Sequence, residues 1–430
     1  MKLCIFGLWH LGSVTAACLA QSGHDVVGLD DNDRVLSGLN AAKAPLFEPG
    51  LDDLIRQGLD TGRLRFTADR SACADADVLW VTFDTPVDDN DRPDTEFVAS
   101  RIRALLPYLR DDALVLVSSQ MPVGSIARLE KGWRDANPDS ALVFACSPEN
   151  LRLGHAIAAF TQQARIVVGM RRDRGREILE PLLQPYCENL IWMSIESAEM
   201  SKHAINAFLG MSVAFSNELA TICEKTGANA FEVEQALKSE PRIGSKAYVR
   251  PGSAFAGGTL ARDIAFLAGL SDEFAFNTPI IQGILPSNST HRLWPLRRAL
   301  EALGPTPSGK TVAVLGLSYK PNTDALRRSI AIETIRELLA AGVDIRAYDP
   351  VVRHLPDALA KVRICASAAE AAAGADALVV ATSWKQFSSL SPADILPHLK
   401  TKTIIDQDRV LGSEFPVAPG IRYVTLGMPT

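Results

Sequence analysis

The sequence has no excess of positive charge and no long hydrophobic run. Its formal net charge is −6 at pH 7 over 430 residues, which leaves no basic surplus to neutralise phosphates and excludes a general nucleic-acid-binding role. No apolar run approaches the roughly 20 residues that a transmembrane helix needs. The first residues read as a short strand and a glycine turn, which is not the pattern of a signal peptide. We therefore expect a cytoplasmic protein without nucleic-acid or membrane partners.

The sequence also lacks paired cysteines and clustered metal ligands. Its seven cysteines are scattered, with no C-x-x-C spacing, and in a cytosolic chain of this length they predict free, mostly buried thiols. No cluster of His, Cys and carboxylate residues has the spacing of a metal site. What the sequence does have is an ordinary globular composition, with 47% hydrophobic and 22% charged residues. Its length suggests two or three domains at roughly 150 residues each.

Strand and helix patterns alternate along the first part of the chain. "KLCIF" at residues 2–6 and "DVVGLD" at residues 25–30 are short apolar strands, and the helical pattern between them ends at Gly23. "DVLWVTF" and "ALVLVSS" predict two more buried strands. Because parallel strands need crossover helices, this alternation predicts a doubly wound parallel sheet.

The alternation stops in the middle of the chain and then resumes. Residues 197–226 contain no proline and no turn cluster, and they predict a helix of about thirty residues, which is either a long core helix or a dimer surface. A second strand–glycine pattern begins at Thr311–Leu315. The sequence thus predicts an α/β fold with two Rossmann-like parallel-sheet domains, at residues 1–195 and 301–430, joined by a long central helix within a helical domain at residues 196–300.

The segment "GLWHLG" at residues 7–12 stands where a dinucleotide-binding loop carries three glycines. Gly7 and Gly12 hold the first and third places, but Trp9 replaces the second glycine. Asp30 ends the next strand, where a carboxylate accepts hydrogen bonds from a ribose and repels the 2′-phosphate of NADP. We expect NAD to bind here if Trp9 points away from the loop; a turn that serves packing only is the alternative. The predicted cofactor residues are Gly7, Trp9, His10, Leu11, Gly12 and Asp30.

A series of specific motifs follows this loop. They are "PLFEPGLDDL" at Pro45–Leu54, "DTPVDDNDRPD", "MPVGS" at Met121–Ser125, "SPENLRLGHAI" at Ser147–Ile157, "AEMSKHAINAFL", "PGSAFAGGTLARD" and "GLSYKPNTDALRRS". In this order, over nearly the whole chain, they resemble the NAD-dependent nucleotide-sugar 6-dehydrogenases, the UDP-glucose and GDP-mannose dehydrogenase family. The resemblance implies a UDP-sugar substrate, a homodimer formed through residues 197–226, a nucleotide-sugar-binding domain at 301–430 and a role in polysaccharide biosynthesis.

Enzymes of this family oxidise a sugar C6 alcohol to an acid by two hydride transfers, with a cysteine holding the intermediate as a thioester. Such chemistry needs a base, oxyanion donors, an activated water and a reactive thiol. The resemblance assigns Lys202 to the developing alkoxide, Asn206 to the oxyanion and Asp263 to the catalytic water. It assigns Glu149 to thioester hydrolysis. A surface lysine and helix-capping carboxylates are the structural alternatives.

The resemblance also implies a set of binding residues. Arg262 and Arg327 would contact cofactor phosphates, and Thr85 and Gln120 would lie on the cofactor side. Arg242 would reach the sugar from the neighbouring subunit. The full set of implied substrate contacts is Glu149, Leu151, Lys202, Asn206, Arg242, Tyr248, Gly257 and Lys320.

The sequence departs from the family pattern at the reacting centre. Aligning "PGSAFAGGTLARD" with the family motif puts Thr259 in the place of the nucleophilic cysteine, and Gln120 replaces a threonine near the reacting sugar. A threonine hydroxyl is far less acidic than a thiol, and its β-branch restricts the side chain. We therefore expect oxidation to stop after one hydride transfer.

Three alternatives remain open from the sequence. Full four-electron oxidation to a UDP-uronic acid could proceed without a thioester, through a hydrated aldehyde. A non-catalytic nucleotide-sugar-binding homologue would tolerate Trp9, Gln120 and Thr259, although it would not need Lys202, Asn206 and Asp263. A 2-hydroxy-acid or phosphogluconate-type dehydrogenase would share the first domain and the long helix, but not the "SYKPNTD" motif of the last domain.

Overall fold

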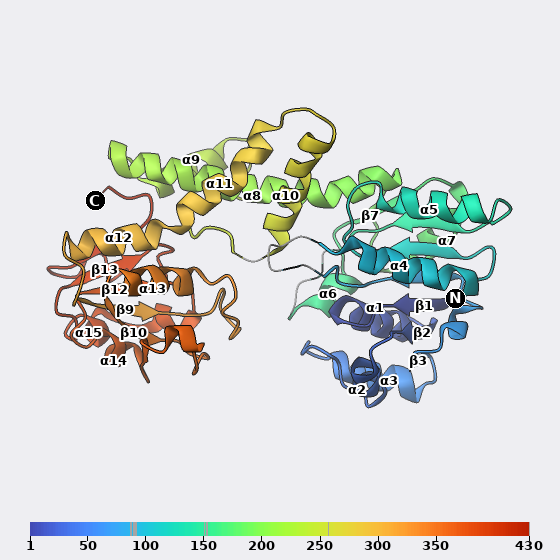
Figure 1. Cartoon of the computed structure of the whole chain (residues 1–430), viewed down its shortest axis with the longest axis horizontal. Helices are drawn as coiled ribbons and strands as arrows, with labels where there is room; N and C mark the ends of the chain where they lie inside the picture. The colour runs from blue at the N-terminus through green and yellow to red at the C-terminus, as the bar shows by residue number, and fades with distance from the viewer. Residues whose placement is uncertain (87, 89–92, 150, 152–153, 257, 430) are drawn as a thin grey trace. The chain divides into compact units, whose positions relative to one another are not determined.

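The chain forms two compact units in the computed structural model, which describes residues 1–430 except 87, 89–92, 150, 152–153, 257 and 430. The units are Met1–Ile205 and Asn206–Thr430, coloured blue to green and green to red in Figure 1. The expected three-domain division at residues 195/196 and 300/301 stays a prediction.

The first unit is built on an eight-stranded sheet of order β3-β2-β1-β4-β5-β6-β7-β8. Neighbouring strands run parallel except β6 and β7, which pair antiparallel, so the doubly wound parallel prediction holds for all but this one step. The strands are β1 (Lys2–Phe6), β2 (Asp25–Leu29), β3 (Leu64–Thr67), β4 (Val78–Val81), β5 (Leu114–Val117), β6 (Val143–Cys146), β7 (Ile166–Met170) and β8 (Leu190–Met193).

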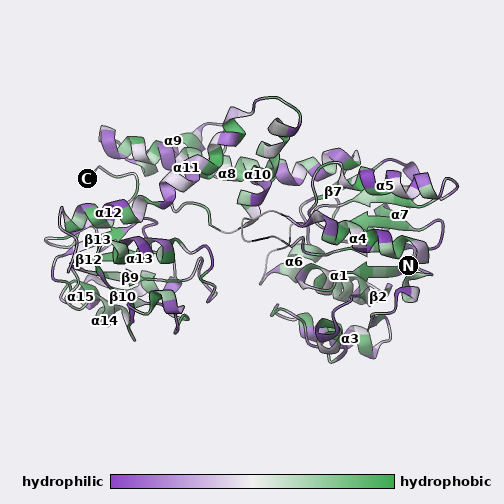
Figure 2. Ribbon diagram, viewed as in Figure 1, coloured by the Kyte–Doolittle hydropathy of each residue, from purple (hydrophilic) through white to green (hydrophobic). Residues whose placement is uncertain are grey.

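Helices cover both faces of this sheet, so its central strands are buried along their whole length. Every residue of β4 and β5 is buried, and alternate residues of the strands fall into two separate hydrophobic clusters, one with α1 and one with α4. Figure 2 shows strands of the first unit largely in the green of hydrophobic residues. The helices are α1 (His10–Gln21), α2 (Asp33–Asn40), α3 (Leu51–Asp60), α4 (Thr95–Leu105), α5 (Ser125–Ala136), α6 (Ala156–Thr161) and α7 (Asp173–Leu183).

The second unit contains a smaller sheet and a group of helices. The sheet is entirely parallel, of order β11-β10-β9-β12-β13-β14. Its strands are β9 (Thr311–Leu315), β10 (Asp344–Tyr348), β11 (Arg363–Ile364), β12 (Ala377–Val380), β13 (Thr403–Asp406) and β14 (Arg422–Val424). The helices are α9 (Ala230–Ser239), α10 (Gly258–Glu273), α11 (Pro279–Arg292), α12 (Trp294–Leu303), α13 (Ile330–Ala340), α14 (Ala368–Ala372) and α15 (Pro392–Ile395).

Helix α8 (Ile195–Thr226) is the long central helix that the sequence predicts. It spans 32 residues, against the expected 197–226, and the boundary between the two units falls within it. Two parallel-dominated sheets with this helix between them in the chain confirm the predicted fold class.

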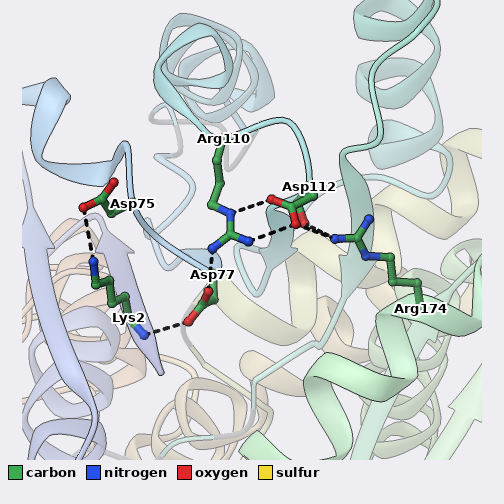
Figure 3. A network of polar contacts seen from close by, with 6 residues as sticks. All are labelled: Lys2, Asp75, Asp77, Arg110, Asp112 and Arg174. Atoms are coloured by element: carbon green, nitrogen blue, oxygen red, sulfur yellow. Dashed lines mark hydrogen bonds and ion pairs between the residues drawn. The ribbon is translucent and has the colours of Figure 1, made fainter.

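A chain of ion pairs fixes the amino ends of the central strands in the first unit (Figure 3). Asp77, just before β4, accepts a hydrogen bond from the Lys2 backbone N–H at 2.9 Å and pairs with Arg110 at 2.8 Å. Asp112 pairs with Arg110 and Arg174, and these guanidinium groups lower the pKa of its carboxyl to about 2. These contacts join the starts of β1, β4 and β5, whereas ligands of open parallel sheets bind in general at the carboxyl edge.

Candidate functional site

The turn after β1 requires both of the glycines that the sequence retains. Gly7 has φ +96°, and a Cβ built on it would lie 2.7 Å from the Phe83 ring. A Cβ on Gly12 would lie 1.9 Å from the Gly7 carbonyl oxygen, which also accepts a hydrogen bond from Thr82 Oγ1 at 2.7 Å. The first and third glycines therefore serve the tight turn and the close packing of α1 on β1.

Trp9 does not pack into the interior of the first unit. It precedes α1, and 42% of it is exposed. No side chain caps the first turn of α1, which begins at His10 and contains Leu11, so this turn keeps backbone N–H donors for an anion. Trp9 in place of the second glycine therefore does not occupy the backbone N–H groups at the start of α1, where an anion would bind.

Asp30 lies just after β2, as a ribose-binding carboxylate requires. Its two oxygens accept hydrogen bonds from the backbone N–H groups of Leu8, at 2.6 Å, and Asn32, at 2.9 Å. Each carboxylate oxygen can accept a further bond. With the glycine turn and the open end of α1, these residues fit a dinucleotide such as NAD.

The second unit repeats the strand–glycine–strand–aspartate pattern, but its aspartate is buried and hydrogen-bonded to neighbouring protein groups. Gly316 follows β9 with φ +90°, and Asp349 follows β10, where it is 0% exposed. The Asp349 carboxylate accepts bonds from Trp384 Nε1 and from the backbone N–H groups of residues 317, 318, 351 and 352. These five donors use the hydrogen-bonding capacity of the Asp349 carboxylate within the protein, so it has little left for a ribose. The dinucleotide site is therefore assigned to the first unit.

Glu48, from the motif "PLFEPG", joins the cofactor turn to the segment that carries Glu149. It is 4% exposed, and its carboxylate lies 3.0 Å from His10 Nε2. It also accepts hydrogen bonds from the backbone N–H groups of Gly154, at 2.7 Å, and Ala156, at 2.8 Å. Burial acts to raise the pKa of Glu48, but these hydrogen bonds outweigh it and hold the pKa below its ordinary value. The sequence reasoning missed this residue.

The first turns of α8 contact the loops that follow β5 and β6. Glu199 accepts hydrogen bonds from the backbone N–H groups of Gly124, at 2.6 Å, and Ile126, at 3.1 Å, and so caps α5. His203 Nε2 lies 3.1 Å from the Met121 carbonyl oxygen. The "MPVGS" segment is therefore held in place by the same helix that carries Lys202.

Lys202 and Glu149 meet in the first unit. Lys202 Nζ donates to the Glu149 backbone carbonyl at 2.8 Å, and the Glu149 side chain accepts from the Leu151 backbone N–H. Burial raises the pKa of the Glu149 carboxyl, with the Lys202 charge acting in the opposite direction. A carboxyl whose pKa is raised by burial, close to a lysine ammonium, is a candidate for proton transfer.

Thr85 and Gln120, which the resemblance predicts on the cofactor side, also contact each other in the first unit. Thr85 Oγ1 donates to the Gln120 backbone carbonyl at 2.5 Å. This bond joins the segment just after β4 to the loop after β5.

In the second unit, the segment before Thr259 is held by hydrogen bonds to its backbone. Asn217 on α8 accepts from the Gly252 N–H at 2.9 Å, and Asp408 accepts from the Ser253 N–H at 2.6 Å. Asn288 on α11 accepts from the Phe255 N–H and donates to its carbonyl, both at 3.0 Å. These side chains fix the start of α10.

Helix α10 carries Thr259, Arg262 and Asp263. Asp263 is 1% exposed and accepts a hydrogen bond from Asn206 Nδ2 on α8. Thr259 is exposed on the first turn, and Arg262 is partly buried. Asn206 and Asp263 thus form a pair within the second unit, and Asn206 stands four residues after Lys202 on α8.

The remaining expected substrate and cofactor residues lie at the surface of the second unit. Lys320 and Arg327 are exposed in the segment between β9 and α13, and the Lys320 ammonium lies 5.4 Å from the Tyr319 ring centre. Tyr248 is 60% exposed, and Arg242 pairs with Glu240 at 2.8 Å. Gly257 lies outside the described residues.

Among the described residues, no group of three or more His, Cys, Asp or Glu residues could hold a metal ion. No helix in the described part of the chain is both long and apolar enough to cross a membrane.

Three family models match the chain in succession. They are the NAD binding domain (residues 1–187), the central domain (196–290) and the UDP binding domain (313–413) of the UDP-glucose/GDP-mannose dehydrogenase family. Among curated proteins, the chain is 33% identical to a UDP-glucose 6-dehydrogenase of Rhizobium meliloti (strain 1021) over 437 aligned residues, covering 100% of both chains. It is 30% identical to a UDP-glucose 6-dehydrogenase of Bacillus subtilis (strain 168), covering 99% of this chain and 98% of the relative.

Solved structures of similar proteins share the fold over the whole chain. A UDP-D-ManNAc dehydrogenase from Pyrococcus horikoshii superposes with a TM-score of 0.85 at 25% identity, covering 99% of both chains. A UDP-glucose dehydrogenase from Pyrobaculum islandicum superposes with a TM-score of 0.83 at 26% identity, covering 99% of this chain and 98% of that one.

Proposed function

Because the chain belongs to the UDP-glucose/GDP-mannose dehydrogenase family, we propose that it oxidises a UDP-sugar and stops after one hydride transfer. Its cofactor is NAD, which supplies the hydride acceptor when bound along Gly7–Gly12 with Asp30 on the ribose. The match of residues 313–413 to the UDP binding domain supports a uridine nucleotide on the substrate.

The residues of the first oxidation are all present in this chain. In the proposed reaction, Lys202 stabilises the alkoxide as the hydroxyl proton leaves, and Asn206 serves as the oxyanion donor. The Asn206–Asp263 hydrogen bond supports this role, since it fixes the orientation of the amide. Glu149, buried and raised in pKa, accepts or returns the proton beside Lys202. None of these groups needs a thiol.

The absence of a usable thiol is the observation that carries the proposal. The motif alignment predicts Thr259 in the nucleophile's place, and all seven cysteines are buried. Cys146 is the cysteine closest in the chain to Glu149, and burial raises its pKa well above the ordinary value, so it stays protonated and inaccessible. Without a thiolate, no thioester forms, and the second oxidation depends on hydration of a carbonyl.

The first test is NADH formation against a panel of UDP-, GDP- and dTDP-sugars. Turnover with UDP-sugars alone supports the proposal. Tight binding of a UDP-sugar with no NADH from any of them supports the alternative, a non-catalytic nucleotide-sugar-binding homologue. Turnover of free hydroxy acids instead of nucleotide sugars contradicts the proposal. A uronic acid formed at an ordinary rate favours the other alternative, four-electron oxidation without a thioester.

We also propose that the chain forms a homodimer through α8. Phe208, Phe215 and Ile222 follow one another at seven-residue spacing and are 60%, 52% and 56% exposed. Seven residues are close to two helical turns, so these side chains form one apolar stripe. Such a stripe is typical of a helix–helix interface. The exposed Arg242 would then contribute to the neighbouring subunit's site.

The cytoplasm remains the proposed location. Seven free, buried cysteines suit a reducing compartment.

A further inference from the structure

A cationic pocket lies beside Thr259 in the second unit. It has a volume of about 330 Å³ and is lined by Ala256, Gly258, Thr259, Leu260, Tyr319, Ala325, Arg327 and Arg328. Two of these residues are arginines, and none of the lining residues that the structure describes is acidic. The pocket also includes the first turn of α10, whose backbone N–H groups add positive potential. Its chemistry therefore favours an anion.

The backbone conformation of Arg328 and its packing against Gly258 hold its side chain in this pocket. It has φ +65°, a conformation that residues other than glycine rarely adopt, in the segment just before α13. A Cβ built on Gly258 would lie 2.1 Å from Arg328 Nη1 and 3.0 Å from its Cζ. With glycine at position 258, the guanidinium packs directly against the backbone at the start of α10, and a side chain there would displace it. The pairing of Gly258 with Arg328 sets a positive charge next to the Thr259 side chain.

We propose that Arg328 and Thr259 form a subsite for a carboxylate on the sugar, so that the substrate is a nucleotide sugar that is already an acid. This inference rests on the proposed function, in which position 259 faces the reacting end of the sugar and Lys320 and Arg327 serve phosphates. A guanidinium and a hydroxyl at this place hold a carboxylate through charge-assisted hydrogen bonds. An acid at C6 needs no thiol, which matches the loss of the cysteine.

The reaction then takes place at a ring hydroxyl. Oxidation of a ring CH–OH to C=O releases one hydride, which NAD accepts, and one proton, which passes to solvent. The products are a ketone that keeps its carboxylate, one NADH and one proton. No thioester and no hydration step is required.

The test compares two ligands that differ only at C6, UDP-glucuronate with a carboxylate and UDP-glucose with an alcohol. Their dissociation constants are measured by calorimetry on the full chain, with and without NAD. We expect the native protein to bind UDP-glucuronate at least tenfold more tightly, since a charge-assisted bond is worth that much. Arg328→Gln should remove this preference, Arg328→Lys should keep part of it, and Arg336→Gln, which removes an exposed charge on α13, should leave it unchanged.

Equal binding of the two ligands by the native protein would overturn the inference, as would a preference that survives in Arg328→Gln. If Arg328→Gln instead weakens NAD binding and leaves the sugar preference intact, the arginine serves the cofactor and the inference is wrong. The calorimetric measurement needs no turnover, so its outcome is independent of the NADH assay that tests the proposed function. The carboxylate preference can hold even if no NADH forms, and NADH can form without the preference.

Discussion

Replacing Glu48 with glutamine should loosen the segment that carries Glu149. The carboxylate accepts hydrogen bonds from Gly154 and Ala156 at 2.7 and 2.8 Å, on different oxygens. Glutamine keeps one acceptor oxygen but sets an amide NH₂ against the other backbone N–H. A hydrogen bond to a charged group contributes about 1.5–3 kcal/mol, so the loss of one should cost about 2 kcal/mol. That free energy corresponds to a roughly 30-fold larger population of the open segment.

The direct assay is amide hydrogen exchange at Gly154 and Ala156, which should accelerate by this factor in Glu48→Gln. We also expect a higher KM for the UDP-sugar, because Glu149 loses its position. Asp53→Asn is the matched control, since Asp53 is an exposed carboxylate on α3 that pairs with Arg56. Unchanged exchange at both amides in Glu48→Gln would refute the reasoning.

The hydrogen bonds of the Glu48 carboxylate should also make the protection of the Gly154 and Ala156 amides depend on pH. Hydrogen bonds lower the pKa of Glu48 below its ordinary 4.5, against the effect of burial. A group whose pKa is lower in the folded state stabilises that state above its unfolded pKa, and the stabilisation is lost as the pH falls through the folded value. Protection of the two amides, corrected for intrinsic exchange, should therefore be constant at neutral pH and decline below about pH 4.5.

Three further predictions concern the cofactor and the dimer. Gly12→Ala should abolish NAD binding in a fluorescence titration, because its Cβ would lie 1.9 Å from the Gly7 oxygen. The control Gly132→Ala, on α5 with open space around it, should bind NAD normally. Retained binding in Gly12→Ala would show that the turn tolerates a side chain. Asp30→Ala should weaken NAD much more than NADP, and equal affinity of the native protein for both would count against the ribose contact. Phe215→Lys should yield monomers in light scattering while Val417→Lys, at another exposed apolar residue, should not; a native monomer with full activity would exclude the α8 interface.

The fold was predictable because its signals are local. Apolar runs with helical patterns between them identified the parallel strands, and β9 coincides with the expected Thr311–Leu315. The antiparallel step at β7 was not predictable, since pairing direction depends on how a connection crosses the sheet and not on the strand's own residues. The uninterrupted pattern at residues 197–226 likewise predicted α8 to within two residues.

The candidate site was only partly predictable from the sequence. The Asn206–Asp263 and Lys202–Glu149 contacts join residues that the motifs had already singled out. Glu48 and Glu199 were not predicted, because the backbone N–H groups that they accept from lie 73 to 108 residues away in the chain. A buried carboxylate between apolar and proline residues, as in "PLFEPG", is the one signal that could have pointed to Glu48, since such a group needs donors. The contact of Arg328 with Gly258 depends on tertiary packing and left no local pattern.

The number of NADH molecules formed per sugar consumed tests the central claim most directly. The measurement uses the full chain with excess NAD and a limiting amount of its UDP-sugar, and mass spectrometry identifies the product. If Thr259 takes the nucleophile's place, as the motif alignment predicts, and with every cysteine buried, we predict one NADH per sugar and a carbonyl product two mass units lighter than the substrate. Two NADH per sugar with a newly formed uronic acid, at an ordinary turnover rate, would contradict the account.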